Sequence, residues 1–589
     1  MSLSRLSEPL IEPNYSTNTR GRQSGVICID SERRTLLSTI IPNRSIPKLG
    51  LIFIVWILPV WSDALGLYSQ TQGGSWLQGA EIQVPLDAST INAAIALAVD
   101  GDEIVVSPGS WNEAIDFAGK QIVIRSTAGP EVTTISGTLD NPVVRFTSGE
   151  SALAHLDGFT IRGGGGVLIN GVRKGGGIYI IDSSPRISNC IVMENQATIG
   201  AGIAIDGGNV TPIELDQVEV SQNQALDAGG GIAVIGSTSG ISLVDCLILQ
   251  NHADIVAGAI YCESSNLQLQ SCQLIENNTD LLAGGVWLYQ ESGATFLDCE
   301  IAQNVTAVTG GGLVVSDYSR VTLDHCRIHD NVGGANGGGV LIDSGDGTET
   351  QVLRFCVFYG NSASASGANL GVSLNVASIL LERCTFGPPA AGAVANITVN
   401  NSIPNILTID SCIIVGGGPQ PVQVLPGSTN AFFSCIEGLA TSSIFSFDCI
   451  DEDPLFVDVS AGNLALELGS ACIDGGNPAL PFDPDGSAPD MGALGPEGVG
   501  SFRRGDVDAS STANLADAVQ VLALLFIPGS AQIECMDAAD ANDDGSVNIT
   551  DAIKILDYLF VSNTPLPAPS DVCGEDPTDD AITCGLICP

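Results

Sequence analysis

Residues 229–251 read GGGIAVIGSTSGISLVDCLILQN, and this stretch decides the fold. It begins with three glycines, which are followed by an apolar run, a short turn, and a second apolar run that carries Cys246 and ends at Asn251. Within 241–251 apolar residues alternate with others, which is the pattern of a strand with one buried face. The stretch therefore predicts short strands joined by tight turns.

The same pattern recurs through the middle of the chain. Successive asparagines are 28, 28, 26, 27, 27 and 30 residues apart, with a glycine cluster and an apolar run between them. Units this short cannot bury a face alone and must stack. We therefore predict a mainly β solenoid in which each unit runs turn, strand, turn, strand, turn. The cysteine and asparagine pairs are Cys190/Asn195, Cys246/Asn251, Cys272/Asn277, Cys299/Asn304, Cys326/Asn331 and Cys356/Asn361, and one further copy has Val218 with Asn223.

Stacking should place equivalent residues in columns about 4.8 Å apart. The asparagines are expected to form a ladder inside a turn, where each side-chain amide bonds backbone or the next amide. The cysteines are expected to form an inward column of small apolar side chains. Parallel Cβ vectors are poor disulfide geometry, so we expect these thiols to be free. Glycines are expected where turns need positive φ.

Both ends of the repeat region resemble pectin-lyase-like proteins. The opening is IQVPLDASTINAAIALAVDGDEIVVSPGSWNEAIDFAGKQIVIR (82–125), and the closing segments are DPLFVD (453–458), LGSACIDGGNP (468–478) and PDMGAL (489–494). The glycine and cysteine–asparagine pattern is also similar to the repeats of polymorphic outer membrane proteins. These resemblances imply a right-handed single-stranded parallel β-helix over residues 80–497, with DPLFVD and its neighbours as closing coils.

A short helix is expected to open the stack at Ile91–Ala98, with Ser89 or Thr90 as N-cap. The family resemblance fixes no activity, because this fold hosts lyases, hydrolases, epimerases and adhesins.

No catalytic residue can be assigned from the repeat. Asp245 and Asp298 both precede ladder cysteines and should share an outward column, two strand spacings or about 9.6 Å apart. That separation fits either an inverting glycosidase pair or a solvated polar column. His325 and His329 are expected to be exposed strand residues, because no third histidine or cysteine stands at metal spacing.

The end of the chain carries a duplicated calcium-loop pattern. DANDDGSVNITD (540–551) matches a twelve-residue loop with Gly545 at its sharp turn. DVDASSTANLAD (506–517) repeats this loop pattern 34 residues earlier. Serine replaces both an acidic ligand and the glycine of the sharp turn, so this site should bind Ca²⁺ more weakly. Helices are expected at 518–526 and 552–560. The predicted Ca²⁺ ligands are Asp540, Asn542, Asp544, Ser546 and Asp551 in one loop and Asp506, Asp508, Ser510, Thr512 and Asp517 in the other.

Loop–helix duplication with aspartate at position 12 resembles type I dockerins. The resemblance implies that residues 498–589 form a small α-helical, dockerin-like EF-hand pair with a cohesin-like protein partner. Cys535, Cys573, Cys584 and Cys588 surround the pair and could form a two-disulfide staple. A four-cysteine zinc site is the alternative.

The first 64 residues predict export. Seven of the 21 basic residues precede the apolar run Leu49–Trp61, and small residues follow at 62 and 64. This order fits a secretory signal cut near Ala64, with an uncleaved signal anchor as the alternative. A net charge of −45 makes nucleic acid and anionic membranes poor partners.

We therefore predict a monomeric, secreted or cell-surface β-helix protein that binds a polysaccharide or a surface glycan, or is adhesive. It would be attached through its calcium module and would not be an enzyme. The alternative is a secreted polysaccharide lyase or glycoside hydrolase of the pectin-lyase-like fold.

Overall fold

The computed structural model describes residues 79–570 apart from 209–210, 238, 344–349, 374–377, 401–406, 419, 425–428, 443, 484–486, 496–501, 509–511, 528–532, 534 and 562–564. The chain divides into two units, Met1–Ser75 and Trp76–Pro589. The predicted leader and signal (1–64), Ser510, Cys573, Cys584 and Cys588 lie outside the described residues. Among the helices that the structure describes, none is long and apolar enough to cross a membrane.

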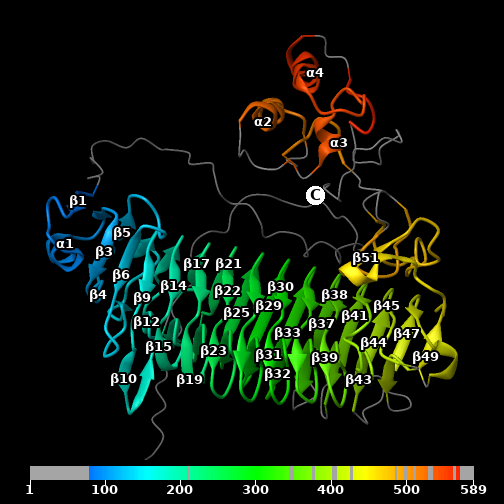
Figure 1. Ribbon diagram of the computed structural model, residues 1–589, viewed down its shortest axis with the longest axis horizontal. Helices are drawn as coiled ribbons and strands as arrows, with labels where there is room; N and C mark the ends of the chain where they lie inside the picture. Colours follow the sequence, from blue (N-terminus) through cyan, green and yellow to red (C-terminus); the bar gives the residue numbers. More distant parts are fainter. Residues whose placement is uncertain are drawn as a thin grey trace, which may run out of the picture. The chain divides into compact units, whose positions relative to one another are not determined.

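Residues 81–447 form a parallel β-helix whose strands stack coil upon coil (Figure 1). A typical coil passes through four sheets, which we name A, B, D and C in chain order. One such coil runs through β17 (Ile213–Asp216), β18 (Glu219–Ser221), β19 (Gln224–Ala228) and β20 (Ile232–Ile235). The chain then returns to sheet A at β21 (Ile241–Val244), which pairs with β17.

The two longer sheets are A and B. Sheet A comprises β1 (Glu81–Val84), β2 (Glu103–Val106), β5 (Val123–Ser126), β8 (His155–Asp157), β13 (Arg186–Ser188), β17, β21, β25 (Asn266–Gln270), β29 (Gly293–Leu297), β33 (Arg320–Asp324), β37 (Thr350–Arg354), β41 (Ser378–Glu382), β44 (Leu407–Asp410), β47 (Thr429–Phe432) and β49 (Phe445–Phe447). Sheet B comprises β3 (Gly109–Asn112), β6 (Thr133–Ser136), β9 (Thr160–Arg162), β14 (Ile191–Met193), β18, β22 (Leu247–Leu249), β26 (Gln273–Ile275), β30 (Glu300–Ala302), β34 (Arg327–His329), β38 (Val357–Tyr359), β42 (Thr385–Phe386), β45 (Ile413–Ile414) and β48 (Cys435–Ile436).

The two shorter sheets are C and D. Sheet C comprises β4 (Ile115–Asp116), β7 (Val144–Phe146), β12 (Ile178–Ile180), β16 (Ile203–Asp206), β20, β24 (Ile260–Glu263), β28 (Val286–Tyr289), β32 (Leu313–Ser316), β36 (Val340–Asp343), β40 (Leu370–Val372), β43 (Ile397–Val399) and β46 (Val422–Val424). Sheet D comprises β10 (Val167–Ile169), β11 (Val172–Lys174), β15 (Gln196–Ile199), β19, β23 (His252–Ala253), β27 (Asn278–Thr279), β31 (Val305–Thr306), β35 (Val332–Gly333) and β39 (Ser362–Ala363).

The expectation of two strands per unit is wrong, because single residues in the left-handed region cut the apolar runs. The run 241–251 bends at Asp245 (φ 51°), which separates β21 from β22, and again at Gln250 (φ 53°). One left-handed residue redirects the backbone without a loop. A single predicted strand thus becomes two strands in different sheets.

The asparagine ladder is confirmed and is longer than predicted. Each side-chain Nδ2 donates to Oδ1 of the next asparagine at 2.8–3.0 Å. In the first seven asparagines, from Asn195 to Asn361, Nδ2 also donates to a backbone carbonyl of the preceding coil. All nine side chains are at most 1% exposed. The column runs through Asn195, Asn223, Asn251, Asn277, Asn304, Asn331, Asn361, Asn369 and Asn396.

The cysteine column is also present and consists of free thiols. Its members lie in the main hydrophobic core, and the column extends beyond Cys356 to Cys384 and Cys412. Burial raises the pKa of the Cys190 thiol to about 12 and that of Cys356 well above its usual range. Their burial in the main core agrees with the predicted column of small apolar side chains.

The three glycines at 229–231 serve three different purposes. Gly229 has φ +62°, which is the left-handed region that favours glycine. A Cβ on Gly230 would lie 2.4 Å from the carbonyl oxygen of His252 in the next coil, and a Cβ on Gly231 would lie 3.1 Å from Nδ2 of Asn251. The cluster thus lets the backbone pass close to the ladder. Positive φ alone does not require glycine, because Ala257 and Ala283 adopt it at positions equivalent to Gly229.

The predicted helix is α1 (Ile91–Leu97), and its N-cap is Thr90, whose side chain accepts from the backbone N–H of Ala93. The closing segments are not coils, which corrects the expectation for 453–494. They include the 3-10 helix η2 (Val459–Ala461) and an antiparallel pair, β50 (Phe456–Asp458) with β51 (Asn463–Leu466). Another 3-10 helix, η1 (Leu439–Thr441), precedes β49.

The closing segment is rich in proline. Positions 454, 478, 481 and 489 are proline, which cannot donate to a strand ladder. The segment instead packs on the side of the last coils. Asn477 Nδ2 donates to Asp410 Oδ2 at 3.0 Å, and the Ala493 N–H donates to Thr385 Oγ1 at 2.9 Å.

Asn277→Ala should destabilise the β-helix strongly. Asn251 would lose the acceptor for both its backbone N–H and its Nδ2, and the carbonyl of Ile248 would lose a donor. Buried unsatisfied groups cost about 1–3 kcal/mol each, so the free energy of unfolding should fall by about 3 kcal/mol or more, as measured by urea denaturation. Asn278→Ala, which removes an exposed neighbour, should cost far less. Equal losses for the two variants would contradict the ladder's role.

Candidate metal centre and surface sites

The C-terminal module contains α2 (Leu515–Phe526), α3 (Met536–Ala539) and α4 (Ile549–Phe560). The two long helices begin three residues before the predicted 518 and 552. Asn514 and Asn548 are their N-caps, and Asp517 and Asp551 complete a capping box at the third helical position. The last residues of each loop are therefore already helical.

The first loop gathers three carboxylates. One ligand oxygen from each of Asp506, Asp508 and Asp517 lies within 4.8 Å of the others, and Asp506 and Asp517 are buried. Asp517 Oδ1 accepts from the backbone N–H groups of Val507 and Asp508 at 2.7 and 3.0 Å. This group of aspartates could hold a metal ion. Thr512 places its carbonyl in the same loop, bonded to Asn514 Nδ2.

The second loop repeats the backbone contacts of the first, but among the described residues only the first loop brings three carboxylates within 4.8 Å of one another. Asp551 accepts from the N–H groups of Asn542 and Asn548, as Asp517 does from Asp508 and Asn514. Asp540 is 1% exposed and accepts from the N–H groups of Asp543, Asp544 and Gly545. Gly545 has φ +78°, as the sharp turn requires. The Ser546 carbonyl accepts from Asn548 Nδ2, matching Thr512.

Two observations indicate that these loops fit a cation. Oδ1 of Asn542, at the third loop position, is buried and accepts no hydrogen bond among the described residues. Burial, together with the nearby carboxylate of Asp540, raises the pKa of Asp551 to about 6. Burial likewise raises the pKa of Asp517, with Asp508 adding to the effect. The donors are all oxygen, which is the set that hard divalent cations prefer.

Sequence reasoning missed Arg504. Its side chain is 0% exposed, donates to the carbonyl oxygen of Asp540 at 2.7 Å, and pairs with Asp543 Oδ1 at 2.8 Å. Its Nε donates to the carbonyl of Ala568, beyond α4. The residue thus ties the second loop to the end of the module. No repeat in the sequence announces it, because the first loop has no equivalent arginine 34 residues upstream.

The two helices expose apolar side chains at matched positions. Each pair is separated by 34 residues, the period of the duplication. Their exposed fractions run from 48 to 81%, so these residues contribute little to the module's own core. The pairs are Leu515 with Ile549, Val519 with Ile553, Phe526 with Phe560, and Ile527 with Val561.

The candidate residues on the β-helix do not form a catalytic site. Asp245 and Asp298 occupy the same corner column as predicted, with Ser271 between them, and all three have left-handed φ. His325 stacks on Phe355 with ring centroids 4.6 Å apart. The expectation that both histidines are exposed holds for His325 and fails for His329, which is only 9% exposed.

His329 is buried because it is bonded on both sides. Its two ring nitrogens bond Glu300 and Asp330 at 2.9 Å each, and its ring stacks on Tyr359. The two carboxylates lie at opposite nitrogens, so the three groups do not converge on one point.

A polar network on the outer face of sheet A was also missed. Ser188 Oγ lies 2.7 Å from His155 Nε2 and donates to Asp157 Oδ1 at 2.6 Å. Arg186 donates to Asp216 Oδ2 at 2.9 Å. This column could have been predicted from the register of the repeat. Asp157, Ser188 and Asp216 each stand two residues before the position that a ladder cysteine, or the residue that replaces it, occupies.

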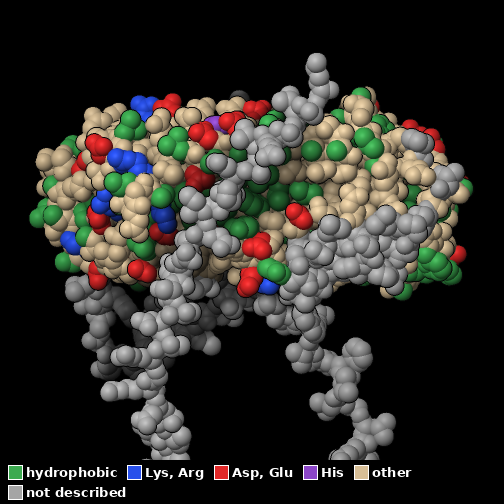
Figure 2. All heavy atoms as spheres, turned by 90° about the horizontal axis from the view of Figure 1, so that it is seen from below, with side chains coloured by type: hydrophobic (Ala, Val, Ile, Leu, Met, Phe, Trp, Pro, Cys, Tyr) green, Lys and Arg blue, Asp and Glu red, His purple; other side chains and the backbone are tan. Residues whose placement is uncertain are grey.

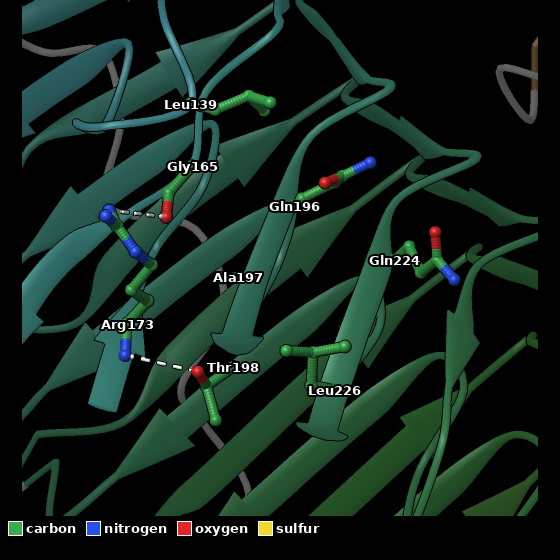
Figure 3. Close-up of a pocket in the computed structure, with 8 residues that line it drawn as sticks. All are labelled: Leu139, Gly165, Arg173, Gln196, Ala197, Thr198, Gln224 and Leu226. Carbon is green, nitrogen blue, oxygen red and sulfur yellow. Dashed lines mark hydrogen bonds between the residues drawn. The ribbon is translucent and has the colours of Figure 1, made fainter. Parts of the chain in front are cut away.

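A pocket of about 240 Å³ lies on the outer face of sheet D (Figure 3). Gln196 and Gln224 are register partners on β15 and β19, and their side-chain amides bond no other described residue. Leu226 and Leu139 give it apolar walls and are 60 and 58% exposed. The Arg173 side chain points away from the glutamines and bonds the Gly165 carbonyl.

Figure 2 shows hydrophobic side chains gathered in a hollow near the middle of one face. The cluster lies between sheets D and C and includes Tyr261 and Val256, with Trp287 and Tyr289 partly buried against it.

Residues 258–436 match a family model described as a right handed beta helix region. Three solved structures are similar at low identity. They are pectate lyase Pel9A (12% identity, 71% of this chain, 96% of that chain, TM-score 0.34), a mannuronic acid specific family 6 lyase from human gut microbiota (12%, 64%, 92%, 0.30) and a GH87 α-1,3-glucanase from Streptomyces thermodiastaticus strain HF3-3 (14%, 64%, 67%, 0.27). No curated protein matches the sequence. The match to the family model supports a right-handed parallel β-helix over residues 258–436.

Proposed function

We propose that this protein is an exported, non-catalytic β-helix that binds carbohydrate and is attached to a protein partner through a Ca²⁺-loaded C-terminal module. The observation that carries the proposal is the duplication itself. Two loops make the same backbone contacts, and the helices that follow expose apolar residues at the same four positions. A small module with an exposed apolar face on each helix is suited to docking.

The identity of the protein partner is part of this proposal. It is supported by the dockerin resemblance together with the apolar face of the two helices. A cohesin-like protein would dock on Val519 and Ile553 or their neighbours. Calcium would act from a distance by fixing the loops that hold α2 and α4 in place. Because the face is duplicated, either helix would offer a similar surface.

Support for carbohydrate binding comes from the pocket on sheet D. Its volume of about 240 Å³ suits a single sugar unit, and the unpaired amides of Gln196 and Gln224 offer donors and acceptors to hydroxyl groups. The exposed leucines offer apolar contact to the sugar ring. A net charge of −45 favours neutral over anionic glycans.

Calcium titration of the full chain should reveal two specific sites by calorimetry, with the loop at 540–551 the tighter. Asp540→Ala with Asp551→Ala should abolish that site and leave the weaker one. Glu214→Ala with Asp216→Ala removes two carboxylates from the β-helix and should leave both sites intact. If the loop variant bound Ca²⁺ like the wild type, the assignment of the ligands would be wrong.

Docking should depend on both helices. Against a panel of purified cohesin modules, the full chain should bind in Ca²⁺ and lose binding in chelator. Val519→Asp with Ile553→Asp should reduce binding at least tenfold by interferometry, because it places charge on both apolar faces. Leu226→Asp, an equally exposed change on the β-helix, should have no effect. Failure to bind any cohesin in Ca²⁺ would overturn the proposed partner.

The alternative function is a polysaccharide lyase or glycoside hydrolase. The observation in its favour is the sheet A network, where Asp157 and Asp216 stand two strand spacings, about 9.6 Å, apart, near the range of inverting enzymes. Incubation with pectin, alginate and neutral glucans, followed at 235 nm and by reducing ends, should give no product. Product that disappears in Asp216→Asn would favour the enzyme.

A further inference from the structure

Cys435 does not belong to the cysteine ladder. The ladder position in its coil is held by Ser434, whose Oγ accepts from the backbone N–H of Cys412 at 3.0 Å. Cys435 is the next residue, the first of β48, and pairs in register with Ile413. Alternation along the strand therefore turns its side chain away from the main core, toward the outer face of sheet B.

The closing segment covers that outer face and brings a second cysteine to it. Cys435 and Cys472 share a small apolar cluster with Leu466 and Met491, separate from the main core. Both cysteines are 0% exposed, and in the structure both are free thiols. Contact between the two thiols raises the pKa of Cys435 and lowers that of Cys472, although 36 residues (436–471) separate them in the chain.

The position of Cys472 is fixed by contacts on both sides. Its carbonyl accepts from the Met491 N–H at 2.9 Å, and its own N–H donates to Ser470 Oγ at 3.2 Å. The adjoining stretch is anchored to the coils, since the Gly492 N–H donates to the Ser411 carbonyl at 2.7 Å and the Asn477 N–H to Ser411 Oγ at 2.8 Å. The meeting of the two thiols thus follows from the packing of the whole closing segment.

We propose that Cys435 and Cys472 form a native disulfide that fastens the closing segment to the last coils. Cys472 approaches from a segment that is not in register with β48, so the constraint of parallel Cβ vectors that keeps ladder thiols apart does not apply. The bond would constrain the unfolded chain by closing a loop of 36 intervening residues.

The chemistry is thiol–disulfide exchange with an external disulfide, such as a disulfide-bearing folding catalyst of an oxidising compartment. The Cys472 thiolate attacks one sulfur of that disulfide and expels the other as a thiolate. Cys435 then attacks the mixed disulfide and expels the second. Two protein thiols lose two electrons, and their two protons end on the two released thiols. Because both cysteines are fully buried when folded, the exchange precedes packing of the closing segment.

The ladder supplies a matched control within the same molecule. The Sγ of Cys412 accepts from the backbone N–H of Cys384 at 3.4 Å, and both side chains are also fully buried, but they stack in register in successive coils. If contact between two thiols were sufficient for oxidation, Cys384 and Cys412 would also form a disulfide. We infer that they remain free.

The test is to produce the full chain through an oxidising secretory compartment of a host, alkylate free thiols in denaturant, and map the digested peptides without reduction. The expected result is a peptide pair joined through Cys435 and Cys472, with Cys384 and Cys412 alkylated. Alkylation of both Cys435 and Cys472, or a bond from either to Cys449, would overturn the proposal. The host supplies the oxidant, so this outcome is independent of the protein's natural export and of calcium binding.

A second measurement avoids reliance on peptide recovery. A reductant should lower the Tm of the wild type by several degrees more than that of Cys435→Ala with Cys472→Ala. Disulfides elsewhere in the chain contribute equally to both proteins. Equal shifts would show that no bond joins the pair.

Discussion

The fold depends on a buried chain of side-chain amides. Each ladder asparagine lies inside a turn, so its donors and acceptor must be satisfied by protein groups. Nδ2 of Asn277 reaches the coil before it and the coil after it, and its Oδ1 accepts from Asn251 twice. A coil that slipped by one residue would leave several of these groups without partners. The ladder therefore fixes the register of the coils as well as their stability.

Other features of the repeat follow from that constraint. Glycine at positions such as 231 leaves room for the amide, and single left-handed residues such as Asp245 make corners without loops. The inner face beside the ladder is apolar, with aliphatic side chains and a few phenylalanines, while the outer face is free to vary. What is distinctive about this chain accordingly lies outside the ladder: the pocket at Gln196 and Gln224, the sheet A network, and the duplicated C-terminal module.

Features that repeat could be predicted from the sequence, because periodicity reports columns. The ladder, the thiol column and the two loops with their helices all carry such a signal. Most features that occur once could not be predicted, and α1, with its N-cap, is the exception. The closing segment packs on the side of the coils, where no period marks it, and Arg504 has no counterpart in the first loop. Strand number was also missed, since a left-handed corner leaves the apolar alternation of 241–251 uninterrupted.

Native-state hydrogen exchange tests the central claim most directly. The backbone N–H groups of Asn195 through Asn331 donate to the next asparagine's Oδ1 and should exchange slowest, as one cooperative block across the coils. Resolved by mass spectrometry of short peptides, these amides should open only with the whole β-helix. Exchange rates of these amides that differ from one coil to the next, or that are as fast as those in the exposed strands of sheet D, would contradict the account.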